Sequence, residues 1–224
     1  MITHSKKTTR LVLAGAVSAV SLGVFACTPA GTGTETAAPA AGMAAQTSAP
    51  TGPMTEAAMT EMLASWPEHA RMAAMDQLKK YGPPQEATAN TLTWRGKGPW
   101  LWTRVDKMET PHAFPGPHPD LMEQAVHYRV PADKVDELNA YDGSVTVYRT
   151  QGYLTARCDT EGANMLALNL AHDIITGTKT VAQARAYYAA AITAFKAGKM
   201  DPYMAELKFS PQGAGAADPD KAAA

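Results

Sequence analysis

The stretch from Asp142 to Cys158 constrains the fold of this chain most, because it has the pattern of a β-hairpin. An Asp-Gly pair precedes a strand over residues 144–149, and a Thr-Gln-Gly turn leads into a second strand over residues 153–158. Apolar and polar residues alternate along both strands, so each strand has one apolar face. Such a hairpin needs further strands or helices to cover that face, which predicts an antiparallel sheet with a packed side.

The remaining pattern predicts a single α+β domain over residues 54–208, with an antiparallel sheet of about five strands and helices packed on one face. Three further strands are predicted at 91–94, 100–105 and 125–130, with a hairpin loop at 95–99. Helices are predicted at about 55–64, from the capping box at 65–68 to residue 81, at 131–140, at 160–176 and at 180–198. The second of these helices is expected to begin in a capping box at Ser65–Glu68, and Thr180 is expected to cap the last one.

The helix over residues 160–176 shows an amphipathic pattern. Leu166, Leu170 and Ile174 recur every four residues and form an apolar stripe. Four polar residues fall on the opposite half of the helix and are expected to form a solvated face: Asn164, Asn169, His172 and Asp173.

The N-terminal 27 residues have the pattern of an export signal. A basic segment, MITHSKKTTR, is followed by an uncharged apolar run of 16 residues that ends in Val24-Phe25-Ala26-Cys27. Sixteen helical residues span about 24 Å, less than the hydrocarbon core of a bilayer. The segment resembles a bacterial lipoprotein precursor, which implies cleavage of residues 1–26 and lipidation of Cys27. An ordinary secretory signal peptide is the alternative. Thr28 after the cysteine favours the outer membrane, facing the periplasm.

The two ends of the mature chain have compositions typical of disorder. Of the 26 residues at 28–53, 23 are Ala, Thr, Gly, Pro or Ser, which predicts a flexible tether from Cys27 to residue 53. Residues 209–224 are expected to form a disordered tail. The formal net charge of −1 argues against a nucleic-acid partner. The expected partners are the membrane, which the lipid on Cys27 would enter, and an envelope protein or a cell-wall glycan.

The proline-rich segment PHAFPGPHPD, residues 111–120, holds the strongest candidate for metal chemistry. His112, His118 and Asp120 have the imidazole and carboxylate groups that zinc and similar ions bind. The same residues are also suited to general acid–base catalysis in a hydrolase. The competing interpretation is an irregular loop in which these side chains bind loop backbone groups.

Three tryptophans around one predicted hairpin provide a candidate ligand-binding face. Trp94, Trp100 and Trp102 are spaced so that their rings could stack on a glycan, and core packing of the same rings is the alternative. Cys158 is expected to be a buried structural thiol, because the strand alternation turns it inward. The chain lacks the common phosphate-binding, nucleophile-elbow and zinc-protease motifs, and no cofactor is predicted.

The stretch from Trp94 to about Tyr188 resembles a set of uncharacterised bacterial envelope proteins. The segments that carry this resemblance are PHAFPGPHPD, YRVPADKVDEL, DGSVTVYRTQGYLTARCD and LALNLAHDI. The resemblance implies an envelope location and no particular activity. Two functions follow as expectations: a lipid-anchored, non-enzymatic binding protein, or a metal-dependent or acid–base hydrolase that uses His112, His118 and Asp120.

Overall fold

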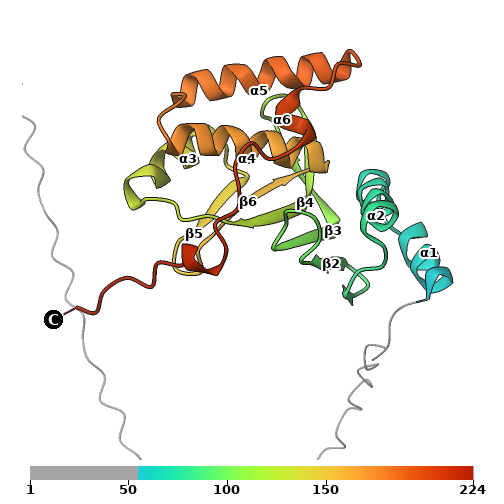
Figure 1. Ribbon diagram of the computed structural model, residues 1–224. Coiled ribbons are helices and arrows are strands. Elements are labelled where there is room, and N and C mark those ends of the chain that lie inside the picture. Colours follow the sequence, from blue (N-terminus) through green and yellow to red (C-terminus); the bar gives the residue numbers. More distant parts are fainter. Residues whose placement is uncertain (1–54, 224) are drawn as a thin grey trace, which may run out of the picture. The chain divides into compact units, whose positions relative to one another are not determined.

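The computed structural model describes residues 55–223, which belong to one compact unit (Figure 1). The predicted signal segment, lipidation site and tether lie outside the described residues. The helices are α1 (Glu56–Ala64), α2 (Glu68–Tyr81), α3 (Val135–Tyr141), α4 (Glu161–Ile175), α5 (Val181–Lys196) and α6 (Pro202–Ala205), with short 3-10 turns at Ala132–Lys134 and Ala214–Ala216. The strands are β1 (Glu86–Ala87), β2 (Thr91–Arg95), β3 (Trp102–His112), β4 (His118–His127), β5 (Val145–Tyr148) and β6 (Tyr153–Cys158).

The strands form one antiparallel sheet in the order β1-β2-β3-β4-β6-β5. The α+β class and the antiparallel sheet are confirmed, with six strands in the described part of the chain instead of about five. The irregular loop considered for residues 111–120 is confined to residues 113–117. β3 continues through His112, β4 already begins at His118, and the two residues face each other in the register. The four prolines are tolerated because those within the strands lie beyond the bulge, near the end of the hairpin.

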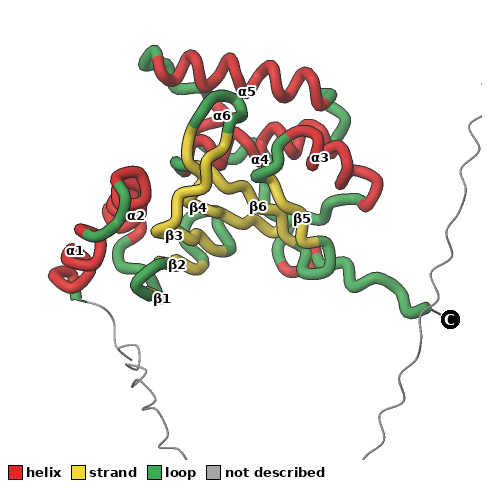
Figure 2. Tube along the Cα trace, turned by 180° about the vertical axis from the view of Figure 1, so that it is seen from behind, coloured by secondary structure: helices red, strands yellow, loops and turns green. Residues whose placement is uncertain are grey.

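The helices cover one face of the sheet, as predicted. Leu92, Val105 and Met122 are neighbours across β2, β3 and β4, and they pack in one buried cluster with residues of α1 and α2. Val126, on the same side of β4 as Met122, packs in a second cluster with residues of α4 and α5. Figures 1 and 2 show α4 lying directly on the sheet and α5 stacked on α4.

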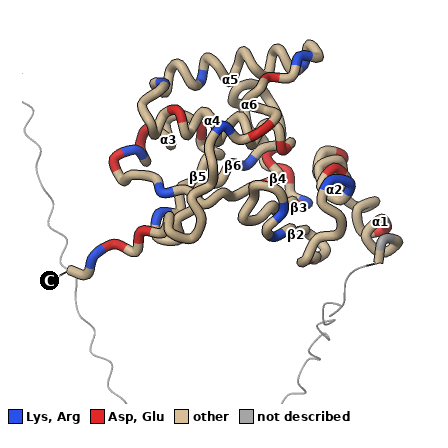
Figure 3. Tube along the Cα trace, viewed as in Figure 1, with Lys and Arg blue, Asp and Glu red and all other residues tan. Residues whose placement is uncertain are grey.

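No helix of residues 55–223 covers the opposite face of the sheet. It carries alternating side chains of β3, β4 and β6, among them Trp102, Arg104, Glu123, Tyr153 and Arg157. Positive and negative side chains are interspersed over the strands and helices (Figure 3). This open face is where the sheet meets solvent.

The helix starts were predicted with mixed success. Thr180 caps α5 through a complete capping box with Gln183, as expected. The capping box at Ser65–Glu68 is wrong: Pro67 occupies the N-cap position of α2, and the Ser65 hydroxyl donates to the Met62 carbonyl instead.

Within residues 55–223, no helix has the length and the apolar run needed to cross a bilayer.

The polar half of α4 is not a solvated face. Asn164, Asn169 and Asp173 are buried, and His172 is partly buried. Asn164 donates to the Met122 carbonyl of β4, whereas α6 and the chain after it pack along Asn169 and Asp173. Asn169 donates to the carbonyls of Tyr203 and Glu206 and accepts from the Lys208 backbone. Hydrogen bonds from polar residues of α4 therefore fix α6 and the chain that follows it against this helix.

The expectation of a disordered tail over residues 209–224 differs from the structure, in which this segment packs against one end of the sheet. The Gln212 and Asp218 amides donate to the carbonyls of His127 and Arg149. Arg129 donates to the carbonyls of Gly215 and Ala217. The sequence did not indicate these contacts, because the tail makes most of them with its backbone groups and not with its side chains.

Candidate metal centre

His112, His118 and Asp120 meet at the end of the β3–β4 hairpin. His112 is the last residue of β3 and pairs with His118, the first residue of β4. Asp120 follows two residues later on β4, so its side chain lies on the same side of the strand as His118. The structure thus brings together three side chains whose spacing in the sequence did not show whether they meet.

The three side chains are close enough to share one ion. One ligand atom from each lies within 4.8 Å of the others. His112 Nδ1 is 3.2 Å from Asp120 Oδ2, and His118 Nε2 is 3.2 Å from Asp120 Oδ1. Two atoms bound tetrahedrally to zinc, each about 2.0–2.2 Å from the ion, are about 3.3–3.5 Å apart. Each imidazole is therefore at about ligand spacing from one oxygen of Asp120, and the two imidazoles face different oxygens of that carboxylate.

Two of these atoms are buried without a well-directed hydrogen bond. His112 Nδ1 and Asp120 Oδ1 have no partner of hydrogen-bonding geometry in the structure, although each lies near an oppositely charged group. Buried polar atoms normally find such a partner, because leaving one unmade costs about 1–3 kcal/mol. The cluster therefore has electron-pair donors left free to bind an additional group.

The outer nitrogen of each imidazole faces an oxygen. His118 Nδ1 lies 2.9 Å from the Gly116 carbonyl, and His112 Nε2 lies 3.8 Å from Asp142 Oδ1. Asp142 is itself fixed by the amide and hydroxyl of Ser144, both of which donate to its Oδ1. In metal sites such outer oxygens orient the histidine ring and leave the inner nitrogen free for the ion.

The sequence analysis assigned Asp142 and Ser144 only to the turn before β5. The Asp-Gly pair indicated that turn, but nothing in the spacing showed that the turn would reach His112. His127, the next histidine along the chain, lies at the far end of β4 and is not part of the cluster.

Electrostatics within the cluster are strongly coupled. The hydrogen-bonding interaction with Asp120 raises the pKa of His118 to about 11, assisted by Cys158 and opposed by burial. Burial raises the pKa of Asp142, while the hydrogen bonds from Ser144 act in the opposite direction. Because a histidine ligand must be neutral, an ion that binds His118 would compete with a proton for this nitrogen.

Cys158 is buried, as predicted, and burial raises the pKa of its thiol. It borders a cavity of about 120 Å³ that His118 and Tyr188 also line. A second hollow, of about 340 Å³, borders Asp120 together with Arg104, Ser144 and Arg157. The cluster is thus bordered by one cavity at His118 and another at Asp120.

The three tryptophans do not form a common ligand-binding face. Trp94 and Trp100 are buried, with 0% and 2% of their surface exposed, and their indole nitrogens donate to the Gly82 carbonyl and to Glu161. Trp102 is only partly buried and lies on the open face of the sheet. Core packing therefore accounts for two of the three rings.

Comparisons with models of known protein families, with curated proteins and with solved structures found no match to this chain.

Proposed function

We propose that this protein is a lipid-anchored protein of the bacterial cell envelope whose folded domain binds a divalent transition metal ion. His112, His118 and Asp120 would be the protein ligands. One observation carries the metal proposal: two imidazoles and a carboxylate converge, with nitrogen–oxygen distances of 3.2 Å, and His112 Nδ1 and Asp120 Oδ1 have no well-directed hydrogen bond.

The chemistry of the donor set narrows the class of ion. Two nitrogen ligands and one carboxylate oxygen suit zinc and its neighbours in the first transition series. Calcium and magnesium prefer six or more oxygen ligands, which this cluster does not supply. We therefore expect zinc to bind much more tightly than calcium or magnesium.

A metal-dependent hydrolase is the second candidate, and one observation favours it. Three protein ligands leave a coordination position for water, and the cavity of about 120 Å³ adjoins His118. A zinc-bound water is acidic enough to act as a nucleophile near neutral pH. Hydrolysis of activated esters by the zinc-loaded protein, lost in His118→Ala, would favour this candidate over simple metal binding.

The anchoring proposal has separate support. It rests on the basic and apolar segments that precede Cys27, so it is tested independently of the metal site. Stable attachment needs more than one acyl chain, which lipidation of an N-terminal cysteine provides. The Cys27→Ser variant should move from the membrane fraction to the soluble fraction, and continued membrane association of that variant would contradict the proposal.

Thermal unfolding tests the metal proposal. The purified protein is stripped with a chelator and then titrated with zinc. Zinc at about one hundred times its dissociation constant adds about 2.7 kcal/mol of stability, which raises the midpoint by about 5–10 °C for a domain of this size. His112→Ala and His118→Ala should lose this rise. His69→Ala is the matched control, because His69 is exposed on α2 and lies outside the cluster. A rise that survives both cluster variants would contradict the proposal.

A further inference from the structure

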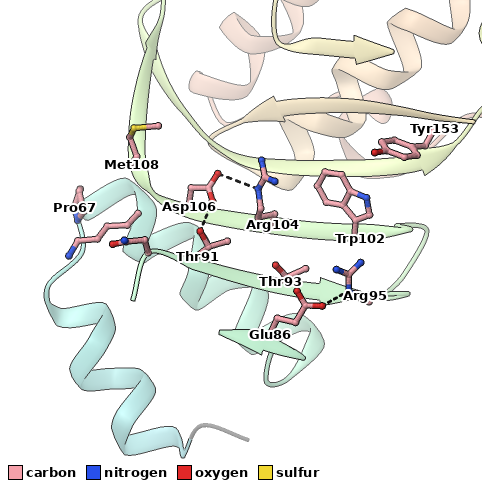
Figure 4. Close-up of a pocket in the computed structure, with 12 residues that line it drawn as sticks. Pro67, Glu86, Thr91, Thr93, Arg95, Trp102, Arg104, Asp106, Met108 and Tyr153 are labelled. Carbon is pink, nitrogen blue, oxygen red and sulfur yellow. Dashed lines mark hydrogen bonds and ion pairs between the residues drawn. The ribbon is translucent and has the colours of Figure 1, made fainter. Parts of the chain in front are cut away.

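A broad groove crosses the open face of the sheet (Figure 4). Its floor is formed by β2 and β3, with Tyr153 of β6 at one end and Pro67 and Met108 at the other. Its volume is about 1050 Å³. Pockets for compact small molecules usually have about 300–1,000 Å³, so a groove of this size suits an extended ligand.

One end of the groove is aromatic. The rings of Trp102 and Tyr153 meet edge to face, with centroids 6.2 Å apart, and Tyr148 stacks on Tyr153 at 4.5 Å. The guanidinium of Arg104 lies 5.7 Å from the centre of the Trp102 ring. All three aromatic side chains are partly exposed. They form an amphipathic platform, with apolar ring faces and polar NH and OH groups at the edges.

The rest of the groove is polar, with its charges largely paired. Arg95 bonds Glu86 at 2.6 Å, and Arg104 Nε lies 3.4 Å from Asp106. Asp106 also accepts from the Thr91 hydroxyl at 2.9 Å. The lining therefore offers many hydrogen-bond donors and acceptors with little net charge.

These features distinguish between classes of extended ligand. A nucleic acid needs several cations that are free to contact phosphates, whereas Arg95 and Arg104 are already paired with acids. Lys107, which bonds the Ser65 hydroxyl, is the one basic residue of the lining without an acidic partner among residues 55–223. A peptide that adds a strand needs a long free sheet edge, whereas β2 and β3 each have a partner strand on both sides and the edge strand β1 has only two residues. A saccharide chain needs neither. The apolar faces of its sugar rings pack on aromatic side chains, and its hydroxyls form hydrogen bonds with the charged and polar side chains of the lining.

We propose that this groove binds a saccharide chain, with Trp102 and Tyr153 as the stacking platform and Arg104 and Asp106 as hydrogen-bonding groups. None of the three candidate metal ligands lines the groove, although Arg104 also borders the hollow next to Asp120. It also revises the expectation of a three-tryptophan face, because Trp102 acts with two tyrosines from the neighbouring hairpin in place of Trp94 and Trp100.

Titration with soluble β-1,4-linked hexamers of N-acetylglucosamine and of glucose tests this proposal. Binding is followed by calorimetry in the presence of a chelator, so the result does not depend on whether the protein binds a metal ion. At least one hexamer should bind. Trp102→Ala and Tyr153→Ala should each weaken binding by about tenfold or more, as for a central aromatic contact.

Two controls keep the result specific. Phe195→Ala removes a partly exposed ring of α5 outside the groove, so it should leave binding unchanged. Trp102→Phe keeps an aromatic face and should bind better than Trp102→Ala, with unfolding midpoints showing that each variant is folded. The proposal is overturned if neither hexamer binds at millimolar concentration, or if Trp102→Ala and Phe195→Ala bind alike. Binding of an unstructured peptide through Trp102, without saccharide binding, would also overturn it.

Discussion

The indole nitrogen of Trp100 donates a 2.6 Å hydrogen bond to Oε1 of Glu161, the first residue of α4. The same carboxylate accepts from the Tyr81 hydroxyl at 2.6 Å and from Lys80 at 2.8 Å, both at the end of α2. Glu161 thereby links the helix pair α1–α2 to the larger helical layer. Its position in the first turn of α4 is also favourable for a negative charge.

We predict that Glu161→Gln destabilises the domain by about 1–3 kcal/mol at pH 7, because hydrogen bonds to a charged acceptor are stronger. Burial opposes ionisation of Glu161, but the hydrogen bonds from Lys80, Tyr81 and Trp100 prevail and lower its pKa below the ordinary value of 4.5. This contribution is therefore complete above about pH 4.5 and is lost as the pH falls through the lower, folded-state pKa.

Urea unfolding at pH 7 and at pH 3 measures this effect. The difference between the wild-type protein and Glu161→Gln should shrink at the lower pH. Glu206→Gln is the control, because Glu206 also pairs with a lysine but is exposed, and its effect should be small at both values. An equal difference between wild type and Glu161→Gln at both pH values would show that the charge of Glu161 does not stabilise the fold.

Asn169 should be one of the most sensitive polar positions in the domain. Asn169→Ala removes two donated bonds and one accepted bond at a residue that is 1% exposed. We expect a loss of about 2 kcal/mol or more, since buried backbone groups are left unpaired. Asn139→Ala, at an exposed position of α3, should change stability by less than about 0.5 kcal/mol. Equal effects of the two substitutions would mean that the buried side of α4 is solvated after all.

Gly152 fixes the C-terminal segment to the sheet. It has a φ of +73°, and a Cβ there would overlap the backbone of Ala216 and Ala217. Gly152→Ala should therefore accelerate hydrogen exchange at the Gln212 and Asp218 amides. Gly96→Ala introduces a similar backbone strain, at a φ of +60°, with no atom within 4 Å, so it should leave exchange at these amides unchanged. Unchanged exchange in Gly152→Ala would support the original expectation of a disordered tail.

The sequence predicted the parts of the fold that depend on local pattern. The alternation over residues 144–158 and the Asp-Gly turn predicted β5 and β6, because side chains alternate across a strand. The capping residues of α5 act within four positions of one another, so they too are readable locally. The placement of helices on one face followed because the apolar residues of the strands share that face.

The failures have a common physical cause, which is tertiary contact between distant segments. Four prolines made residues 111–120 look irregular, but pairing with β4 extends β3 through His112. Asn169 looked solvent-facing because its partners, at Tyr203, Glu206 and Lys208, lie more than 30 residues away. The candidate metal ligands were identified by residue type alone, and their convergence required the hairpin that brings His112 opposite His118.

The metal proposal assigns His112, His118 and Asp120 to one bound ion. X-ray absorption spectroscopy of the purified protein loaded with one equivalent of zinc tests it most directly. We predict a first shell of nitrogen and oxygen atoms at about 2.0–2.2 Å with the outer-shell signal of two imidazoles, and loss of that signal in the double variant His112→Ala/His118→Ala. A spectrum without imidazole ligands, or one that the double variant leaves unchanged, would contradict the claim.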